Sequence, residues 1–104
     1  MLTIHTVNDT QIECDLILRS IQYNALSIYT HAITPIQAYQ IFDNPEETAV
    51  LTVTEKGKPT KLYRGFTDVF SVQKNRMLAH EDGILIILMH PQPDDDEEVI
   101  PNAE

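Results

Sequence analysis

An alternation of apolar and polar residues over positions 11–19 constrains the fold more than any other feature of this 104-residue chain. One side of the alternation holds Ile12, Cys14, Leu16 and Leu18, and the other holds Gln11, Glu13, Asp15 and Arg19. A period of two residues is typical of a β-strand with one buried face, because successive side chains point to opposite sides of a sheet. Ile17 is the one apolar residue on the polar side.

Two further segments repeat this strand pattern. Residues 1–7 alternate weakly, and Asn8-Asp9 is typical of a tight hairpin turn, since both residue types tolerate a positive φ. Residues 25–32 alternate again, with apolar residues opposite Ser, Tyr and His. We therefore predict a β-meander of three strands at the start of the chain.

The pattern then changes to that of a short helix. Thr34-Pro35 is a helix-start signature, because the threonine hydroxyl can cap a free backbone N–H and proline is tolerated at the first helical position. Asp43-Asn44-Pro45 should end the helix after about two turns, since the residue before proline disfavours helical backbone. A helix this short is unstable alone and must pack on a sheet.

The rest of the chain reads as strands and a tail. We predict a strand over 48–55, a turn over 56–59, and one long strand or two strands joined by a bend over 60–74, with a bulge at Gly65. The apolar segment 84–90 predicts a strand that is buried on both faces or lies at a subunit contact.

These elements predict a strand-dominant α+β fold. We expect an antiparallel curled sheet or partly open barrel of about six strands with one short helix. The length predicts a single globular β-rich domain over residues 1–90. Residues 91–104, which contain three prolines and a run of five acids, predict a flexible acidic tail.

No residue pattern specific to catalysis or cofactor binding is present. The four histidines, His5, His31, His80 and His90, lack ligand spacing, and the single cysteine, Cys14, lies on an apolar strand face. Only three glycines occur, without a phosphate-binding loop. We therefore predict no catalytic, cofactor-binding or metal site and no enzyme activity. A small-molecule or metal-binding module, with histidines and Tyr63 or Tyr29 lining a pocket, is a lesser alternative.

Charge is segregated along the chain, whose net charge is −9. Residues 56–80 hold six bases and one acid, for +5, whereas residues 81–104 hold eight acids and no base, for −8. Complementary patches of this kind favour oriented packing of copies or partners. The predicted interaction surface comprises Lys56, Lys58, Lys61, Arg64, Lys74, Arg76, Asp94, Asp95, Asp96, Glu97 and Glu98. A tail that only keeps the protein soluble is the alternative.

A central stretch of the chain carries a resemblance to a known class of proteins. Residues 34–72 contain IFDNPEETAVLTV (Ile41 to Val53), a charged turn, and LYRGFTDVFSV (Leu62 to Val72). This stretch resembles small proteins encoded in phages and prophages of Gram-positive bacteria, near tail, baseplate or head-fibre genes. The resemblance implies a small β-rich module that docks on copies of itself or on other particle proteins, and it implies no catalytic residue.

The sequence thus favours a non-enzymatic phage-type structural or assembly module. Its expected partners are proteins, as a homo-oligomer or with phage particle proteins, without direct nucleic-acid or membrane binding. The expected location is the cytoplasm of the bacterial host during assembly, or the virion, because no apolar run reaches the length of a membrane span and no secretory signal is seen. The alternative is an acidic inhibitor, of anti-CRISPR or anti-restriction type, of a nucleic-acid-binding enzyme.

Overall fold

Two hairpins open the chain, and each turns at a non-glycine residue with a positive φ. The first joins β1 (Leu2–His5) to β2 (Gln11–Cys14) through Asp9, whose φ is 62°, as the Asn8-Asp9 pair predicts. The second joins β3 (Leu16–Ser20) to β4 (Ala25–Thr30) through Asn24, whose φ is 52°. Asparagine and aspartate adopt this left-handed backbone more readily than other side chains, because their short polar groups can hydrogen-bond locally.

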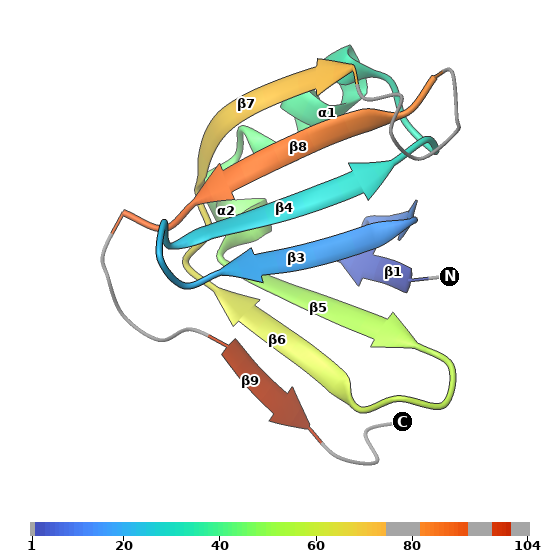
Figure 1. Cartoon of the computed structure of the whole chain (residues 1–104), viewed down its shortest axis with the longest axis vertical. Helices are drawn as coiled ribbons and strands as arrows, with labels where there is room; N and C mark the ends of the chain where they lie inside the picture. The colour runs from blue at the N-terminus through green and yellow to red at the C-terminus, as the bar shows by residue number, and fades with distance from the viewer. Residues whose placement is uncertain (1, 75–81, 92–96, 101–104) are drawn as a thin grey trace.

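The computed structural model describes residues 2–74, 82–91 and 97–100, which form nine strands and two short helices (Figure 1). The strands make two antiparallel sheets. Sheet A has the order β2-β1-β5-β6-β9, and sheet B has the order β3-β4-β8-β7. The strand bounds are Leu2–His5 (β1), Gln11–Cys14 (β2), Leu16–Ser20 (β3), Ala25–Thr30 (β4), Val50–Glu55 (β5), Thr60–Arg64 (β6), Asp68–Lys74 (β7), Ile84–Met89 (β8) and Glu97–Ile100 (β9).

The strand-dominant α+β fold is confirmed, with two corrections to its details. The described residues form nine strands instead of about six, and two helices instead of one. The strands divide between two sheets that do not close into a barrel as far as the described residues go. Two of the extra strands arise because the predicted segments 11–19 and 60–74 are each divided by a change of sheet, and the third, β9, lies in the predicted tail.

The predicted strand over 11–19 breaks at Asp15, where the chain leaves sheet A and enters sheet B. The two sheets are joined at this corner, because the backbone N–H of Asp15 donates to the carbonyl of Tyr29 and the Thr30 hydroxyl donates to the carbonyl of Glu13. The three-strand meander is therefore wrong as a single sheet. The break also reverses the alternation, so that Ile17 packs against the core and Leu18 is exposed.

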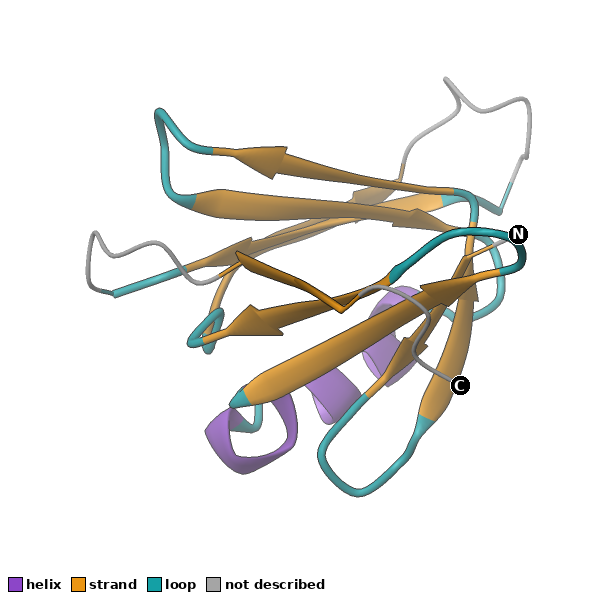
Figure 2. Ribbon diagram, turned by 90° about the horizontal axis from the view of Figure 1, so that it is seen from below, coloured by secondary structure: helices purple, strands orange, loops and turns teal. Residues whose placement is uncertain are grey.

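The helix α1 (Pro35–Phe42) begins and ends where the sequence predicts. Thr34 and Gln37 form a capping box, in which each side chain accepts a hydrogen bond from the other residue's backbone N–H. Pro45 ends α1 as expected, but it also begins a second helix, α2 (Pro45–Thr48), which occupies the first residue of the predicted strand 48–55. Figure 2 shows both helices on one side of the β-rich body.

The chain returns from sheet A to sheet B at Gly65, between β6 and β7. The predicted bend is confirmed, and Gly65 has a φ of 84° that suits glycine. Its backbone N–H donates to the carbonyl of Ala49. The predicted bulge is misplaced, since the register shift lies between Val69 and Ser71 in β7.

The last described strand corrects part of the expected tail. β9 pairs with β6, with Glu97 opposite Tyr63 and Ile100 opposite Thr60. Residues 97–100 therefore form a strand at the edge of sheet A, instead of a flexible segment. Residues 92–96 and 101–104 lie outside the described residues.

A single hydrophobic core fills the space between the two sheets and α1. Its fully buried members come from both sheets and from the helix, and include Ile4, Leu51, Leu26, Ile86 and Phe42. Because the same cluster holds all three components, each sheet depends on the other for burial of its inner face. Within the described ranges, we find no helix with the length and apolar character needed to cross a bilayer.

Candidate protein-docking surface

The strand β8 is apolar on both faces, but the structure covers only one of them. Ile84, Ile86 and Leu88 point into the core and are nearly inaccessible to solvent. The alternate residues point to the other side of sheet B, where no described element covers them, and are half-buried: Leu85, Ile87 and Met89. The prediction of burial on both faces is therefore wrong for the described residues, whereas the alternative of a subunit contact remains a prediction.

The neighbouring strands continue this uncovered apolar surface. The register of sheet B places Leu16, Tyr29 and Leu85 in one row, and Leu18, Ser27 and Ile87 in the next. Leu18 is 50% exposed. We call the surface the outer face of sheet B; it comprises Leu16, Leu18, Ser20, Tyr23, Ala25, Ser27, Tyr29, Phe70, Ser71, Gln73, Leu85, Ile87 and Met89, with Asp68 at its margin.

A β-bulge adds an aromatic side chain to this face. Val69 is opposite Leu88 and Ser71 is opposite Ile87, so Phe70 is the extra residue on β7. A bulge redirects side chains locally, because two residues of one strand oppose one residue of its neighbour. Phe70 is consequently 70% exposed, while Val69 packs against the core.

A shallow hollow lies on the outer face of sheet B, beside Tyr23 and Phe70. Its volume is about 260 Å³, and its lining comes from the β3–β4 turn and from strands β4, β7 and β8. Tyr23, which is 65% exposed, and Phe70 both line it. Exposed aromatic side chains beside an apolar hollow are typical of the centre of protein–protein interfaces.

The outer face of sheet B is almost free of charge in a strongly charged protein. Asp68, at the start of β7, is the one charged residue in its described rows. The chain as a whole has a net charge of −9. Depletion of charge together with exposed aromatic and aliphatic groups distinguishes the core of an interface from ordinary protein surface.

The structure gathers some of the predicted interaction residues and separates others. Lys56 and Lys58 lie on the β5–β6 turn, and Lys61 and Arg64 lie on β6. Lys74 is at the end of β7 in the other sheet, beside a hollow lined by His31 and Asp82. Arg76, Asp94, Asp95 and Asp96 lie outside the described residues, while Glu97 and Glu98 begin β9 next to β6 of the same chain.

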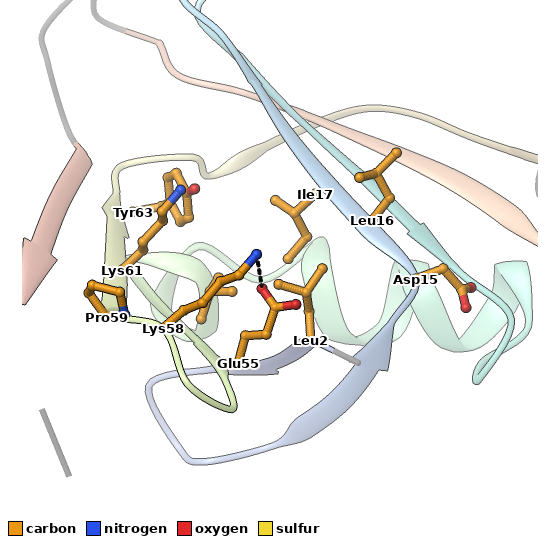
Figure 3. Close-up of a pocket in the computed structure, with 10 residues that line it drawn as sticks. Leu2, Asp15, Leu16, Ile17, Glu55, Lys58, Pro59, Lys61 and Tyr63 are labelled. Carbon is orange, nitrogen blue, oxygen red and sulfur yellow. Dashed lines mark ion pairs between the residues drawn. The ribbon is translucent and has the colours of Figure 1, made fainter. Parts of the chain in front are cut away.

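A second concavity lies between the two sheets, beneath the edge strand β3 (Figure 3). It has a volume of about 350 Å³. Its apolar wall consists of Leu2, Ile17, Val53 and Tyr63, and its rim carries Glu55, Lys58 and Lys61. Lys58 Nζ is 3.5 Å from Glu55 Oε1, forming an ion pair across the rim. We call this concavity the inter-sheet cleft.

The titratable groups of the described body serve structure more clearly than chemistry. His31 Nδ1 is 2.8 Å from Asp15 Oδ2, and this hydrogen bond, reinforced by nearby acidic charges, raises the pKa of His31. Burial, followed by the charges of Asp15 and Glu13, raises the pKa of the Cys14 thiol to about 12. A thiol with so high a pKa is not nucleophilic near neutral pH. No group of three or more metal-ligating side chains occurs within residues 2–74 and 82–91.

Comparison with known proteins adds no relative: no family model, no curated protein and no solved structure matches this chain.

Sequence reasoning missed most of the outer face of sheet B. It placed Leu16 and Leu18 on the buried side of their strand, and it did not assign Tyr23 or Phe70 to a surface. Ile17 is the signal that would have corrected this prediction, because it is apolar but falls on the polar side of the alternation. It marks the point after Asp15 where the buried and exposed faces of the strand exchange. Segment 84–90 did carry the signal directly, because every residue of Ile84–Met89 is apolar.

Proposed function

We propose that this protein is a non-enzymatic docking module of the phage structural or assembly type, which self-associates through the outer face of sheet B. The supporting observation is the uncovered apolar surface built around Phe70, Ile87 and Leu18 on four strands. A continuous apolar face is unfavourable in water and is stabilised when another surface covers it.

A second copy of the same chain is the occupant that the charge distribution favours. Two copies that each have a net charge of −9 repel one another over most orientations. The outer face of sheet B carries only Asp68, at its margin, so two copies can meet there with little burial of charge. Packing face to face about a two-fold axis gives a self-complementary sheet-on-sheet contact.

The size of the face sets the expected strength of the dimer. Four strands about 4.8 Å apart, with about six residues each, make a face of roughly 20 by 20 Å. Two such faces bury on the order of 800–1,000 Å², which is near the lower limit for specific protein–protein interfaces. We therefore expect a dimer with a dissociation constant of about 1–100 μM.

The test is a substitution of the aromatic residue at the bulge, Phe70→Ser. We expect it to weaken dimerisation at least tenfold, because truncating a central aromatic anchor typically costs about 2 kcal/mol of binding. Ile36→Ser is the matched control, since Ile36 is 71% exposed on α1 and is not part of the outer face of sheet B. Sedimentation velocity across a concentration series measures the dissociation constant of each protein, and thermal unfolding checks that each is folded.

Two results would contradict the proposal. One is a wild-type protein that sediments as a monomer at every concentration, and the other is an equal loss of dimer in the two variants. Docking on other particle proteins, and a location in the bacterial cytoplasm during assembly, belong to the same proposal. The acidic-inhibitor alternative stays a prediction, because most of the acids on which it depends lie outside the described residues.

A further inference from the structure

The strand β3 has an edge with no neighbouring strand among the described residues. β3 lies at the end of sheet B and pairs only with β4. An edge strand presents a row of backbone N–H and C=O groups, to which another extended chain can hydrogen-bond. Proteins usually protect such edges with charged side chains, prolines or bulges.

Two other edge strands carry such protection, whereas β3 does not. β2 points Glu13 into solvent, and β7 contains the bulge at Phe70. In β3, the outward residues Leu16 and Leu18 are uncharged. Its one charged residue, Arg19, is engaged with Ser20 and Asn24 and lies over the Phe66 ring. The edge of β3 is therefore open to pairing.

The inter-sheet cleft lies directly beside this edge. Sheet A has five strands and sheet B has four, and sheet A continues past β3, with β5, β6 and β9 below it in Figure 1. Ile17 forms the wall of the cleft under β3, while Val53 and Tyr63 form the wall on sheet A. A fifth strand of sheet B would need about 4.8 Å of width, and it would lie over this cleft.

The rim of the cleft is asymmetric in charge. Lys58 and Lys61 lie at the side formed by the β5–β6 turn and β6, and Asp15 lies at the opposite end, just before β3 (Figure 3). Glu55 pairs with Lys58 and Asp15 pairs with His31, while Lys61 is exposed on β6. Lys61 would attract the acidic end of an extended segment, and Asp15 would repel it.

We propose that the edge of β3 accepts an extended segment of a partner protein as a fifth strand of sheet B. Its backbone pairs with β3, its inward apolar side chains fill the inter-sheet cleft against Ile17 and Tyr63, and its acidic end lies at Lys61. Main-chain hydrogen bonds supply affinity and the alternate side-chain positions supply specificity in this mode of recognition. The inference concerns the edge of β3 and the inter-sheet cleft, which share Leu16 with the outer face of sheet B, and it does not depend on self-association.

The geometry disfavours two other occupants of this edge. A second copy that paired through its own β3 would bring a second sheet A, which also continues past β3, so the two overhanging sheets would collide. A small molecule could fill the cleft, but it would leave the backbone groups of β3 unpaired. A single extended strand satisfies both the backbone edge and the apolar wall.

The test uses the full-length chain and a fluorescent peptide, Thr-Val-Thr-Val-Thr-Asp-Asp, as the probe. Fluorescence anisotropy measures the dissociation constant of the peptide, and amide chemical shifts report which strand it contacts. We expect binding to shift β3 amides and to weaken about fivefold to tenfold in Lys61→Glu. Lys56→Glu is the matched control, because Lys56 lies on the same hairpin but does not line the cleft. A peptide N-methylated along one edge should not bind, because it cannot pair with β3.

Each alternative outcome overturns the inference. No binding of the unmodified peptide means that the edge does not accept a strand. Binding that survives N-methylation means that the cleft takes the probe without backbone pairing. A dimer that is lost in Lys61→Glu but retained in Phe70→Ser means that a second copy occupies the edge. Because Phe70 does not line the cleft, failure of peptide binding leaves the test of self-association unaffected.

Discussion

At the scale of single residues, a few backbone positions determine how the chain moves between the two sheets. Gly65 allows the turn from β6 to β7 because its φ is 84°, a conformation that side-chain-bearing residues rarely adopt. The imidazole of His90 occupies the space where a side chain at position 65 would lie. The His90 ring also packs edge-on against Phe66, at a centroid distance of 5.5 Å. Glycine is therefore required here for both backbone and packing reasons.

We predict that Gly65→Ala lowers the free energy of unfolding by about 2 kcal/mol or more, through left-handed strain and displacement of His90. Gly57→Ala is the matched control, because Gly57 has a φ of 81° but a methyl group added there would meet no other atom within 4 Å. We expect that control to cost about 1 kcal/mol from strain alone. Urea unfolding of the two variants measures the difference, and equal losses would show that His90 does not matter.

The sequence predicts single residues well where the signal is local. Asp9 at the first turn, Thr34 at the helix start and Gly65 at the bend are each identified by their own residue type. The orientation of Leu18 could not be predicted in the same way, because it depends on the change of sheet at Asp15. That change is made by contacts with Tyr29 and Thr30, which are distant in sequence.

At the scale of elements, the corner between β2 and β3 is one of the links between the sheets. His31, just after β4, bonds Asp15 at this corner, and Asp82 and Glu13 add negative charge around the imidazole. Lys74 lines the same hollow as His31 and Asp82. The net effect raises the pKa of His31 above the value of 6.5 expected for a free side chain.

This linkage predicts a pH-dependent stability. Because the pKa of His31 is higher in the folded state, its contribution is fully present below about pH 6.5 and is lost as the pH rises through the folded pKa. The melting temperature of the wild type should therefore fall, relative to that of His31→Gln, between about pH 6 and about pH 8. Parallel melting curves of the two proteins across this range would contradict the assignment.

Pairing between elements shows the limit of prediction from the sequence. The hairpin β1–β2 and the helix α1 follow from local turn and cap signals. The pairing of β8 between β4 and β7, and of β5 next to β1, joins segments that are far apart in the chain. Such pairing depends on which apolar faces fit one another, and the alternation of a strand does not specify its partner.

At the scale of the whole molecule, one core unites sheet A, sheet B and α1. Leu51 of β5 and Ile86 of β8 are both fully buried in it, although they belong to different sheets. The sequence predicts the fold class from this apolar content and its period. It predicts the docking surface only in part, because the uncovered side of a strand is known only when its neighbours are placed.

The shared core predicts that the two sheets unfold together. We expect Leu51→Ala and Ile86→Ala each to lower the free energy of unfolding by about 2–5 kcal/mol and to leave a single transition. Circular dichroism and tyrosine fluorescence, followed in the same denaturant titration, should give coincident curves for both variants. A variant in which one probe changes before the other would show that the sheets unfold separately.

Because Cys14 is buried, the reactivity of its thiol can be used to measure opening of the core. Its thiol is the only one in the chain and lies in the core where β2 meets the corner. An alkylating reagent can reach the sulfur only after the layers have parted, and the high pKa keeps it protonated until then. The rate of alkylation under native conditions therefore reports how often the core opens around Cys14, without any added label.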